Sequence, residues 1–167
     1  MVKQIQIYRI GLRVERLHTV PHLLSYSNGH HSANAALIAH EICKEEGISS
    51  SSVVLYMLMH DVAEGYTGDV PANVKRDNGD LKFELDRIED KWVKRNLPDM
   101  PDLSHEEKAI AKAADLIELG MHCTDEIFAG NRNVKVVLMN VVNYLHSMYH
   151  IKSVKKITEK FLIGESL

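Results

Sequence analysis

A histidine and two carboxylates stand close together where an apolar segment ends. His60 and Asp61 directly follow the apolar run 53–59, and Glu64 lies one helical turn beyond His60. A charge buried without a partner is so costly that such a group is normally paired, neutralised or bound to a metal. Residues 48–70 contain no lysine or arginine that could act as this partner. Adjacent nitrogen and oxygen donors can reach one cation, so the pattern predicts half of a metal site.

A second histidine candidate comes from the predicted helix over residues 30–46. His31 begins the apolar face of this helix, whereas His30 lies on the neighbouring, more polar face. The apolar face continues through Ala35, Ile38 and Ile42. A single histidine on such a face is more often a hydrogen-bonded core residue than a ligand. The presence of His60–Asp61 favours a ligand role for His31.

The fourth candidate donor is Asp115, which stands among small apolar residues. Such an aspartate could equally cap a helix or pair with an arginine. Combined with His31, His60 and Asp61, it completes two nitrogen and two oxygen donors, a set that suits manganese, iron, cobalt, zinc or nickel. An octahedral ion would keep two positions for water and a substrate oxygen, as metal-assisted hydrolysis requires.

The elements expected to carry these residues are helical. Residues 4–17 alternate partly like a strand, but a lone strand would lack a partner, so this segment is predicted to be helical. A turn-rich loop is expected over residues 66–78. Hydrophobic spacing, capping residues, glycines and prolines predict further helices over 30–46, 49–64, 81–96, 104–121, 134–150 and 153–162. The predicted fold class is all-α.

Bulk properties exclude several classes of protein. A chain of 167 residues suits one domain, predicted to span 1–167. The formal net charge of -3 gives no electrostatic reason to expect nucleic acid binding. No apolar stretch approaches the roughly 20 residues of a membrane span. Cys43 and Cys123 lie in apolar helical patterns and are expected to be reduced core thiols, so a cytoplasmic location is predicted.

The order of these motifs resembles the HD-domain metal-dependent phosphohydrolases. The string over 60–75, which reads His-Asp-x-x-Glu and then Thr-Gly-Asp-x-Pro, is its most specific part. With residues 15–19 and His31–Ser32, it resembles the branch that contains bacterial 5′-deoxynucleotidases and phage dATP triphosphohydrolases. The resemblance covers residues 13–115. It implies a compact HD-domain helical bundle, a divalent transition metal such as cobalt, zinc or manganese, a deoxynucleotide substrate and a homo-oligomer.

The resemblance also implies roles for individual residues. Glu64 is expected to exchange a proton with water or the leaving oxygen, since it lies one turn from the metal ligand His60. Asp69 resembles the second acid/base residue of this branch, although an aspartate after Gly68 could also simply form a turn. The expected phosphate and nucleoside contacts are Arg16, Lys75, Leu17 and Thr19.

Two substrates and one non-catalytic role are compatible with these residues. Leu17 stands where the bacterial monophosphatases have a tryptophan, and Lys75–Arg76 offers charge for a longer phosphate chain. The preferred hypothesis is therefore a dATP triphosphohydrolase that releases deoxyadenosine and triphosphate. The alternative is a 5′-deoxynucleotidase acting on deoxynucleoside monophosphates. An idle regulatory HD domain is a third hypothesis, disfavoured because no ligand or acid/base residue is missing.

Overall fold

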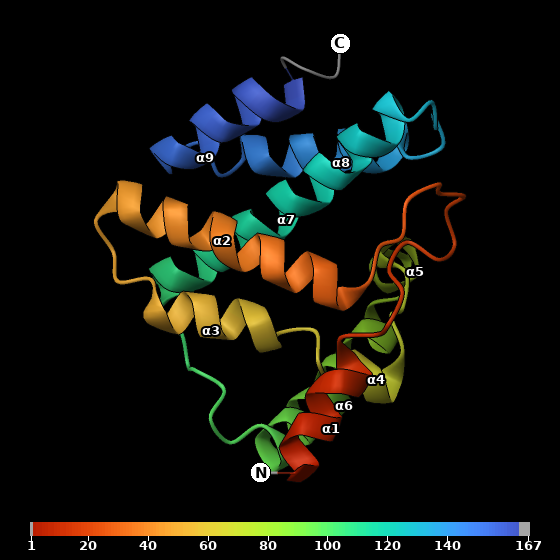
Figure 1. The fold of residues 1–167 in the computed structure, drawn as a ribbon, viewed down its shortest axis with the longest axis vertical. Helices are drawn as coiled ribbons and strands as arrows, with labels where there is room; N and C mark the ends of the chain where they lie inside the picture. Colours follow the sequence, from red (N-terminus) through yellow and green to blue (C-terminus); the bar gives the residue numbers. More distant parts are fainter. Residues whose placement is uncertain (1, 164–167) are drawn as a thin grey trace.

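The computed structural model describes residues 2–163, and these residues are helical without a regular strand (Figure 1). The predicted all-α class is therefore confirmed. None of the described helices is both long and apolar enough to cross a membrane. The elements are α1 Val2–Gly11, α2 Asn28–Glu46, α3 Ser51–Met59, α4 Glu64–Thr67, α5 Ala72–Asp77, α6 Gly79–Asn96, α7 His105–Phe128, α8 Lys135–His146, α9 Lys152–Ile157 and the π-helical segment η1 Thr158–Ile163.

Helix α7 is the central element of the fold. It packs against α2 and α3 along one part of its length and against α8 along another (Figure 1). Ser104 and Glu107 form the predicted capping box at its start, and the helix runs seven residues beyond the predicted end at Met121. Small residues on α2 and α7 allow the two helices to approach closely. The fully buried core residues include Ala35, Ala39, Ile42, Ala113, Ala114 and Ile117.

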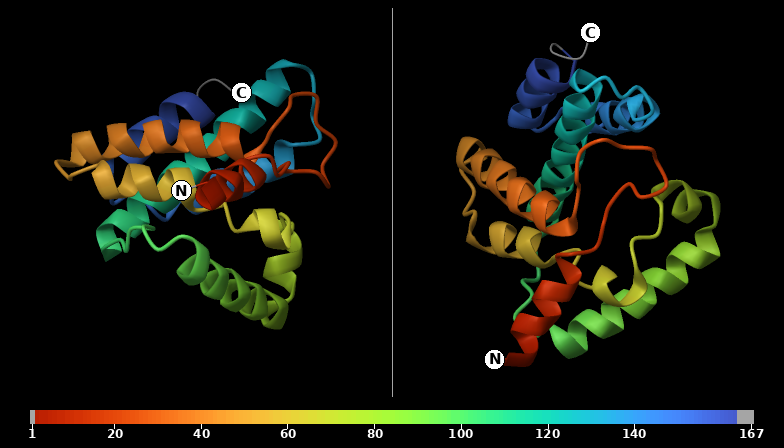
Figure 2. Two further views of the ribbon diagram at one scale, coloured as in Figure 1. Left: turned by 60° about the horizontal axis from the view of Figure 1, so that its bottom comes forward. Right: turned by 45° about the vertical axis from the view of Figure 1, so that its right-hand side comes forward.

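A second, smaller core joins α1, the end of α3 with the turn after it, and α6, at the end of the molecule away from α8 and α9 (Figure 2). It is built on Met59, Val62 and Leu97, with Trp92 packed against them. The close approach of α1 depends on Gly11, because a Cβ added there would lie 2.5 Å from the carbonyl oxygen of Val62. This contact places α1 directly against the turn that carries Asp61.

The predicted helix through Glu64 is interrupted. Helix α3 ends at Met59, and residues 60–63 form a tight turn before α4 begins at Glu64. The backbone N–H of Glu64 donates to the carbonyl oxygen of Asp61 at 3.1 Å, an i→i+3 bond instead of the α-helical i→i+4. The apolar run before this turn is also only partly buried, since Leu55 and Leu58 are exposed.

The segment between α1 and α2 is a loop and not the predicted continuation of a helix to Leu17. Its two arms meet in an isolated antiparallel bridge between Glu15 and Ser27. The backbone N–H of Arg16 donates to the carbonyl oxygen of Tyr26 at 2.8 Å. Leu17 follows with a φ of 52°, a left-handed conformation that is unusual for leucine. This pairing fixes the backbone that presents the Arg16 side chain.

Several smaller predictions can be checked against the structure. Cys43 and Cys123 are buried free thiols, as expected. The predicted loop over 66–78 contains the short helix α5. The apolar face of α8 serves mainly the core, since Leu138, Val141 and Leu145 are buried. This face therefore gives no support to the predicted homo-oligomer, which stays a prediction.

Candidate metal and phosphate site

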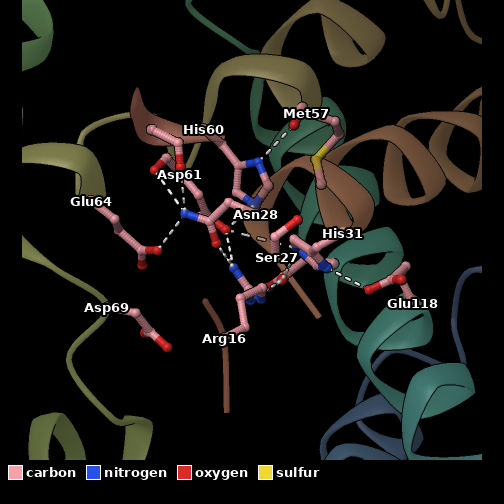
Figure 3. A network of polar contacts seen from close by, with 12 residues as sticks. Arg16, Ser27, Asn28, His31, Met57, His60, Asp61, Glu64, Asp69 and Glu118 are labelled. Atoms are coloured by element: carbon pink, nitrogen blue, oxygen red, sulfur yellow. Dashed lines mark hydrogen bonds and ion pairs between the residues drawn. The ribbon is translucent and has the colours of Figure 1, made fainter. Parts of the chain in front are cut away.

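Three of the four predicted donors converge from three different elements. His31 comes from α2, His60 from the turn after α3, and Asp115 from α7; one ligand atom of each lies within 4.8 Å of the others. The fourth, Asp61, places Oδ2 3.1 Å from Nε2 of His60 and 3.8 Å from Nε2 of His31. Figure 3 shows the His60, Asp61 and His31 side chains directed toward a common point. The structure thus brings together the residues predicted to bind metal.

The choice between the two neighbouring histidines of α2 follows from helix geometry. His31 is completely buried, whereas His30 is exposed, as the periodicity predicted. Ser27 caps the helix by accepting the backbone N–H of His30, so the first turn is firmly placed. The burial of the ring and the cap hold His31 in place in the first turn of α2.

The chemistry of the two rings fits a cation between them. Nδ1 of His60 lies 2.7 Å from the carbonyl oxygen of Met57, so it carries the hydrogen, and in the neutral ring Nε2 presents a lone pair. Nε2 of His31 lies 3.1 Å from Oδ1 of Asp115. Among the described residues, neither Nε2 has a hydrogen-bond partner of suitable geometry. A lone pair facing a carboxylate is repulsive unless positive charge lies between them, and a divalent metal supplies that charge.

The pKa values of these groups show how strongly the site favours positive charge. Burial opposes the charged imidazolium, but the carboxylate of Asp61 outweighs burial and raises the pKa of His60 to about 8. Burial alone would raise the pKa of Asp61, yet contacts with His60 and Arg16 hold it below its usual range. For Asp115, too, contacts with His31 and Lys112 outweigh burial and lower the pKa. Lone pairs and carboxylates that attract a proton this strongly also attract a metal ion.

Arg16 supplies the positive charge that the local sequence around His60 lacks. Its Nη1 donates to Oδ2 of Asp61, 45 residues further along the chain, and to Oδ1 of Asn28 at 3.1 Å. Its Nη2 lies 3.9 Å from Oδ1 of Asp115. The expectation that the carboxylates have no cationic partner nearby is therefore wrong for the folded chain, because the loop after α1 returns to the site.

Asp115 has a second cationic partner, Lys112, whose Nζ donates to Oδ2 at 2.6 Å. The sequence left open that Asp115 pairs with a cationic side chain and does not bind a metal, and such a pair is present. Lys112 binds Oδ2, whereas Oδ1 faces His31, so the two oxygens of this carboxylate have separate partners. Oδ1 is the atom directed into the candidate metal site.

Glu64 lies beside the candidate metal site without belonging to its donor group. The side chain is 9% exposed, and its Oε2 accepts a hydrogen bond from Nδ2 of Asn28 at 2.8 Å (Figure 3). Burial, with the negative charges of Asp61 and Asp69 added to it, raises the pKa of Glu64 to about 7. A carboxyl group with such a pKa can take and return a proton near neutral pH.

The remaining predicted residues differ in exposure and in the contacts that they make. Asp69 is partly buried, and its Oδ2 lies 3.7 Å from Nδ1 of His18. Leu17 is half-buried and Thr19 is exposed, both on the loop after Arg16. Lys75 is half-buried on α5 and forms no ion pair with another described residue. Asp69 lies in the segment between α4 and α5, and Lys75 lies on α5.

Sequence reasoning missed three polar residues that contact the site. Asn28 is completely buried and links Arg16 to Glu64, but at the start of a helix it is indistinguishable from a capping residue. Glu118 contacts His31, and its position one turn beyond Asp115 on the same helix face was an available signal. Tyr26 donates to Glu118, and nothing in its loop sequence indicates this role.

The helical fold and this His, His-Asp, Asp donor set define a protein of the HD-domain class. Residues 12–164 match the family described as YfbR-like 5′-deoxynucleotidases. The chain belongs to this family.

Proteins with related sequences support the family assignment. The 5′-deoxynucleotidase YfbR of Salmonella arizonae is 31% identical over 127 residues, which cover 64% of this chain and 63% of that protein. The 5′-deoxynucleotidase ECA3034 of Pectobacterium atrosepticum is 29% identical over 121 residues, covering 60% of this chain and 61% of the relative. The match thus spans less than two thirds of the length of these curated relatives.

Solved structures show the same fold at lower sequence identity. An HD-domain phosphohydrolase of Listeria innocua, lin2634, has a TM-score of 0.78 at 19% identity, covering 98% of this chain and 88% of that chain. The HD phosphohydrolase DatZ of cyanophage S-2L, solved with dA and one catalytic Zn²⁺ ion, has a TM-score of 0.71 at 17% identity. That comparison covers 99% of this chain and 95% of DatZ.

Proposed function

We propose that this protein is a metal-dependent 5′-deoxynucleotidase that hydrolyses deoxynucleoside 5′-monophosphates to deoxynucleoside and phosphate. The observation that carries the proposal is the convergence of His31, His60 and Asp115 from three elements, with Asp61 beside them. Membership of the YfbR-like family supports the substrate class. These findings favour the monophosphate over the dATP substrate that the sequence alone made the preferred hypothesis.

The metal site in this proposal consists of His31, His60, Asp61 and Asp115. When bound there, a divalent cation would supply Lewis acidity, which polarises a phosphoryl oxygen and acidifies water. The two histidines offer nitrogen lone pairs, and the two aspartates offer negative charge to match the cation. This mixed donor set is compatible with zinc, cobalt or manganese.

Glu64 is the proposed acid/base residue. Its carboxylate takes a proton from the attacking water, and the resulting acid returns a proton to the 5′-oxygen as the phosphorus–oxygen bond breaks. The raised pKa of about 7 suits both steps. The hydrogen bond from Asn28 holds one carboxylate oxygen in place during this exchange. Asp69, which lies close enough to influence that pKa, is the second candidate for proton transfer.

Arg16 and Lys75 are the proposed phosphate ligands. The Arg16 guanidinium already lies beside Asp61, so it can share its remaining donors with a phosphate held at the same point. Lys75 has no ion-pair partner among residues 2–163, which leaves its ammonium group available for an anion. Leu17 and Thr19 are the proposed contacts for the sugar and base.

A substrate panel tests the proposal. The four deoxynucleoside monophosphates and dATP would be incubated with the protein and Co²⁺, Mn²⁺ or Zn²⁺, with products separated by chromatography. The expected result is deoxynucleoside and phosphate from the monophosphates and little change in dATP. Release of triphosphate from dATP with monophosphates left intact would contradict it. No hydrolysis with any metal would instead support an idle, regulatory HD domain.

A further inference from the structure

Glu118 is a buried carboxylate on α7 that the proposed reaction does not use. Its side chain is almost inaccessible to solvent, and it lies one helical turn beyond Asp115. Oε2 lies 2.5 Å from Nδ1 of His31 and accepts a hydrogen bond from the Tyr26 hydroxyl at 2.5 Å. Oε1 accepts a hydrogen bond from Nδ2 of Asn34 at 3.5 Å. Every contact of this carboxylate is therefore with a group that can donate.

These contacts determine the hydrogen position on the His31 ring. A carboxylate can only accept, so Nδ1 of His31 must carry the hydrogen at this distance. In the neutral ring Nε2 then holds the lone pair, and this atom is the one directed toward Asp115. Figure 3 shows Glu118 on the side of the His31 ring away from His60 and Asp61.

Tyr26 in turn keeps Glu118 in place. Its ring stacks on the His122 ring with a centroid distance of 3.8 Å and an angle of 7° between the planes. This stacking aims the hydroxyl at Oε2 of Glu118. The carboxylate therefore has little freedom to turn away from His31.

We propose that Glu118 is a positioning residue that fixes the tautomer and orientation of His31 for metal binding. This inference rests on the metal site of the proposed function and adds a residue that determines how tightly this site binds the metal ion. Outer acceptors of this kind make an imidazole more basic, and their loss typically weakens metal binding by about 10–100-fold. In the corresponding position, His60 has the neutral carbonyl oxygen of Met57, at 2.7 Å from Nδ1.

The first test needs no variant. Long-range proton–nitrogen NMR on the metal-free wild-type chain reports which ring nitrogen of each histidine carries hydrogen, and His31→Asn assigns the signal of His31. At alkaline pH, where the imidazole ring is neutral, the expected result is hydrogen on Nδ1 and not on Nε2. A predominant Nε2–H form of His31 would overturn the inference.

The second test measures Co²⁺ affinity by competition with a chelator, together with the visible spectrum of the bound ion. Glu118→Leu removes the acceptor and is expected to weaken binding about 10–100-fold. Glu118→Gln keeps an amide oxygen at the same place and should lose less. Glu126→Gln is the matched control, because it alters another buried carboxylate of α7 that makes no contact with His31. Thermal unfolding without metal shows whether each variant is folded.

The outcomes separate this inference from the proposed function. If Glu118→Leu is folded and binds Co²⁺ as tightly as the wild type, the role of Glu118 is overturned but the metal site is not. If Glu118→Leu does not fold, a Co²⁺ affinity of Glu118→Gln equal to that of the wild type, together with a wild-type His31 that carries no hydrogen on Nδ1, overturns it. A wild-type chain that binds no Co²⁺ overturns the metal site and the inference together. None of these measurements uses a nucleotide, so failure to find the substrate does not affect them.

Discussion

Two ring nitrogens, Nε2 of His31 and Nε2 of His60, each lie 3.1 Å from a carboxylate oxygen and lack a hydrogen-bond partner of suitable geometry within residues 2–163. Groups in this arrangement need positive charge between them. Arg16 supplies some of that charge from outside, and a metal ion would supply it at the centre. The residue types and spacing predicted the four donors, but not Arg16 as their partner, because that contact depends on how the loop after α1 returns.

Glu64→Gln tests proton transfer by the residue beside these donors. The amide keeps an oxygen that can accept from Asn28, so the local structure should survive. We expect the turnover of deoxynucleoside monophosphates to fall by about 100-fold or more, because general acid–base catalysis typically contributes at least that much. Initial rates measure the effect, with Co²⁺ affinity as the control that should not change. A variant with full turnover would show that Glu64 does not move the proton.

The elements bring the donors together through close backbone packing that the sequence pattern only partly indicates. Helical periodicity correctly predicted α2, α6 and α7 and the buried position of His31. It did not predict the end of α3 at Met59, because residues 60–63 have helical composition and are bent by packing against α1. A glycine at position 11 has no evident purpose in the sequence until the turn beside it is known.

Gly11→Ala tests this packing between elements. The added methyl group would lie 2.5 Å from the carbonyl oxygen of Val62, so α1 or the turn must shift. We expect the free energy of unfolding to fall by about 1–3 kcal/mol. Chemical denaturation measures the change. Gly79→Ala is the matched control, because a Cβ there meets nothing within 4 Å and should leave stability nearly unchanged. Equal stability of the two variants would refute the role of this contact.

Across the whole molecule, Glu126 joins the far end of α7 to the loop that leads from Arg16 to α2. Its carboxylate accepts the backbone N–H groups of Leu23 and Leu24, at 2.9 and 2.6 Å, and the amide of Asn131 at 2.6 Å. Burial would raise its pKa, but these hydrogen bonds outweigh burial and lower it. This connection spans more than 100 residues of sequence, which is why no local pattern predicts it.

Glu126→Gln tests the connection through the pH dependence of stability. A carboxyl whose pKa is lower in the folded chain stabilises it above the unfolded pKa of about 4.3, and this contribution is lost as the pH falls through the folded value. We expect the variant to be less stable than the wild type at about pH 6 and the difference to shrink at about pH 3.5. Urea unfolding at both pH values measures it. A difference that grows toward acid pH would contradict this account.

In the proposed function, His31, His60, Asp61 and Asp115 together hold one metal on which hydrolysis depends. Its most direct test is a titration of metal-stripped protein with Co²⁺ while phosphate release from a deoxynucleoside monophosphate is measured. We expect about one equivalent of Co²⁺ to restore activity in the wild type, and Asp115→Asn to need far more metal for any activity. Equal phosphate release from the metal-stripped and metal-loaded wild type would contradict it.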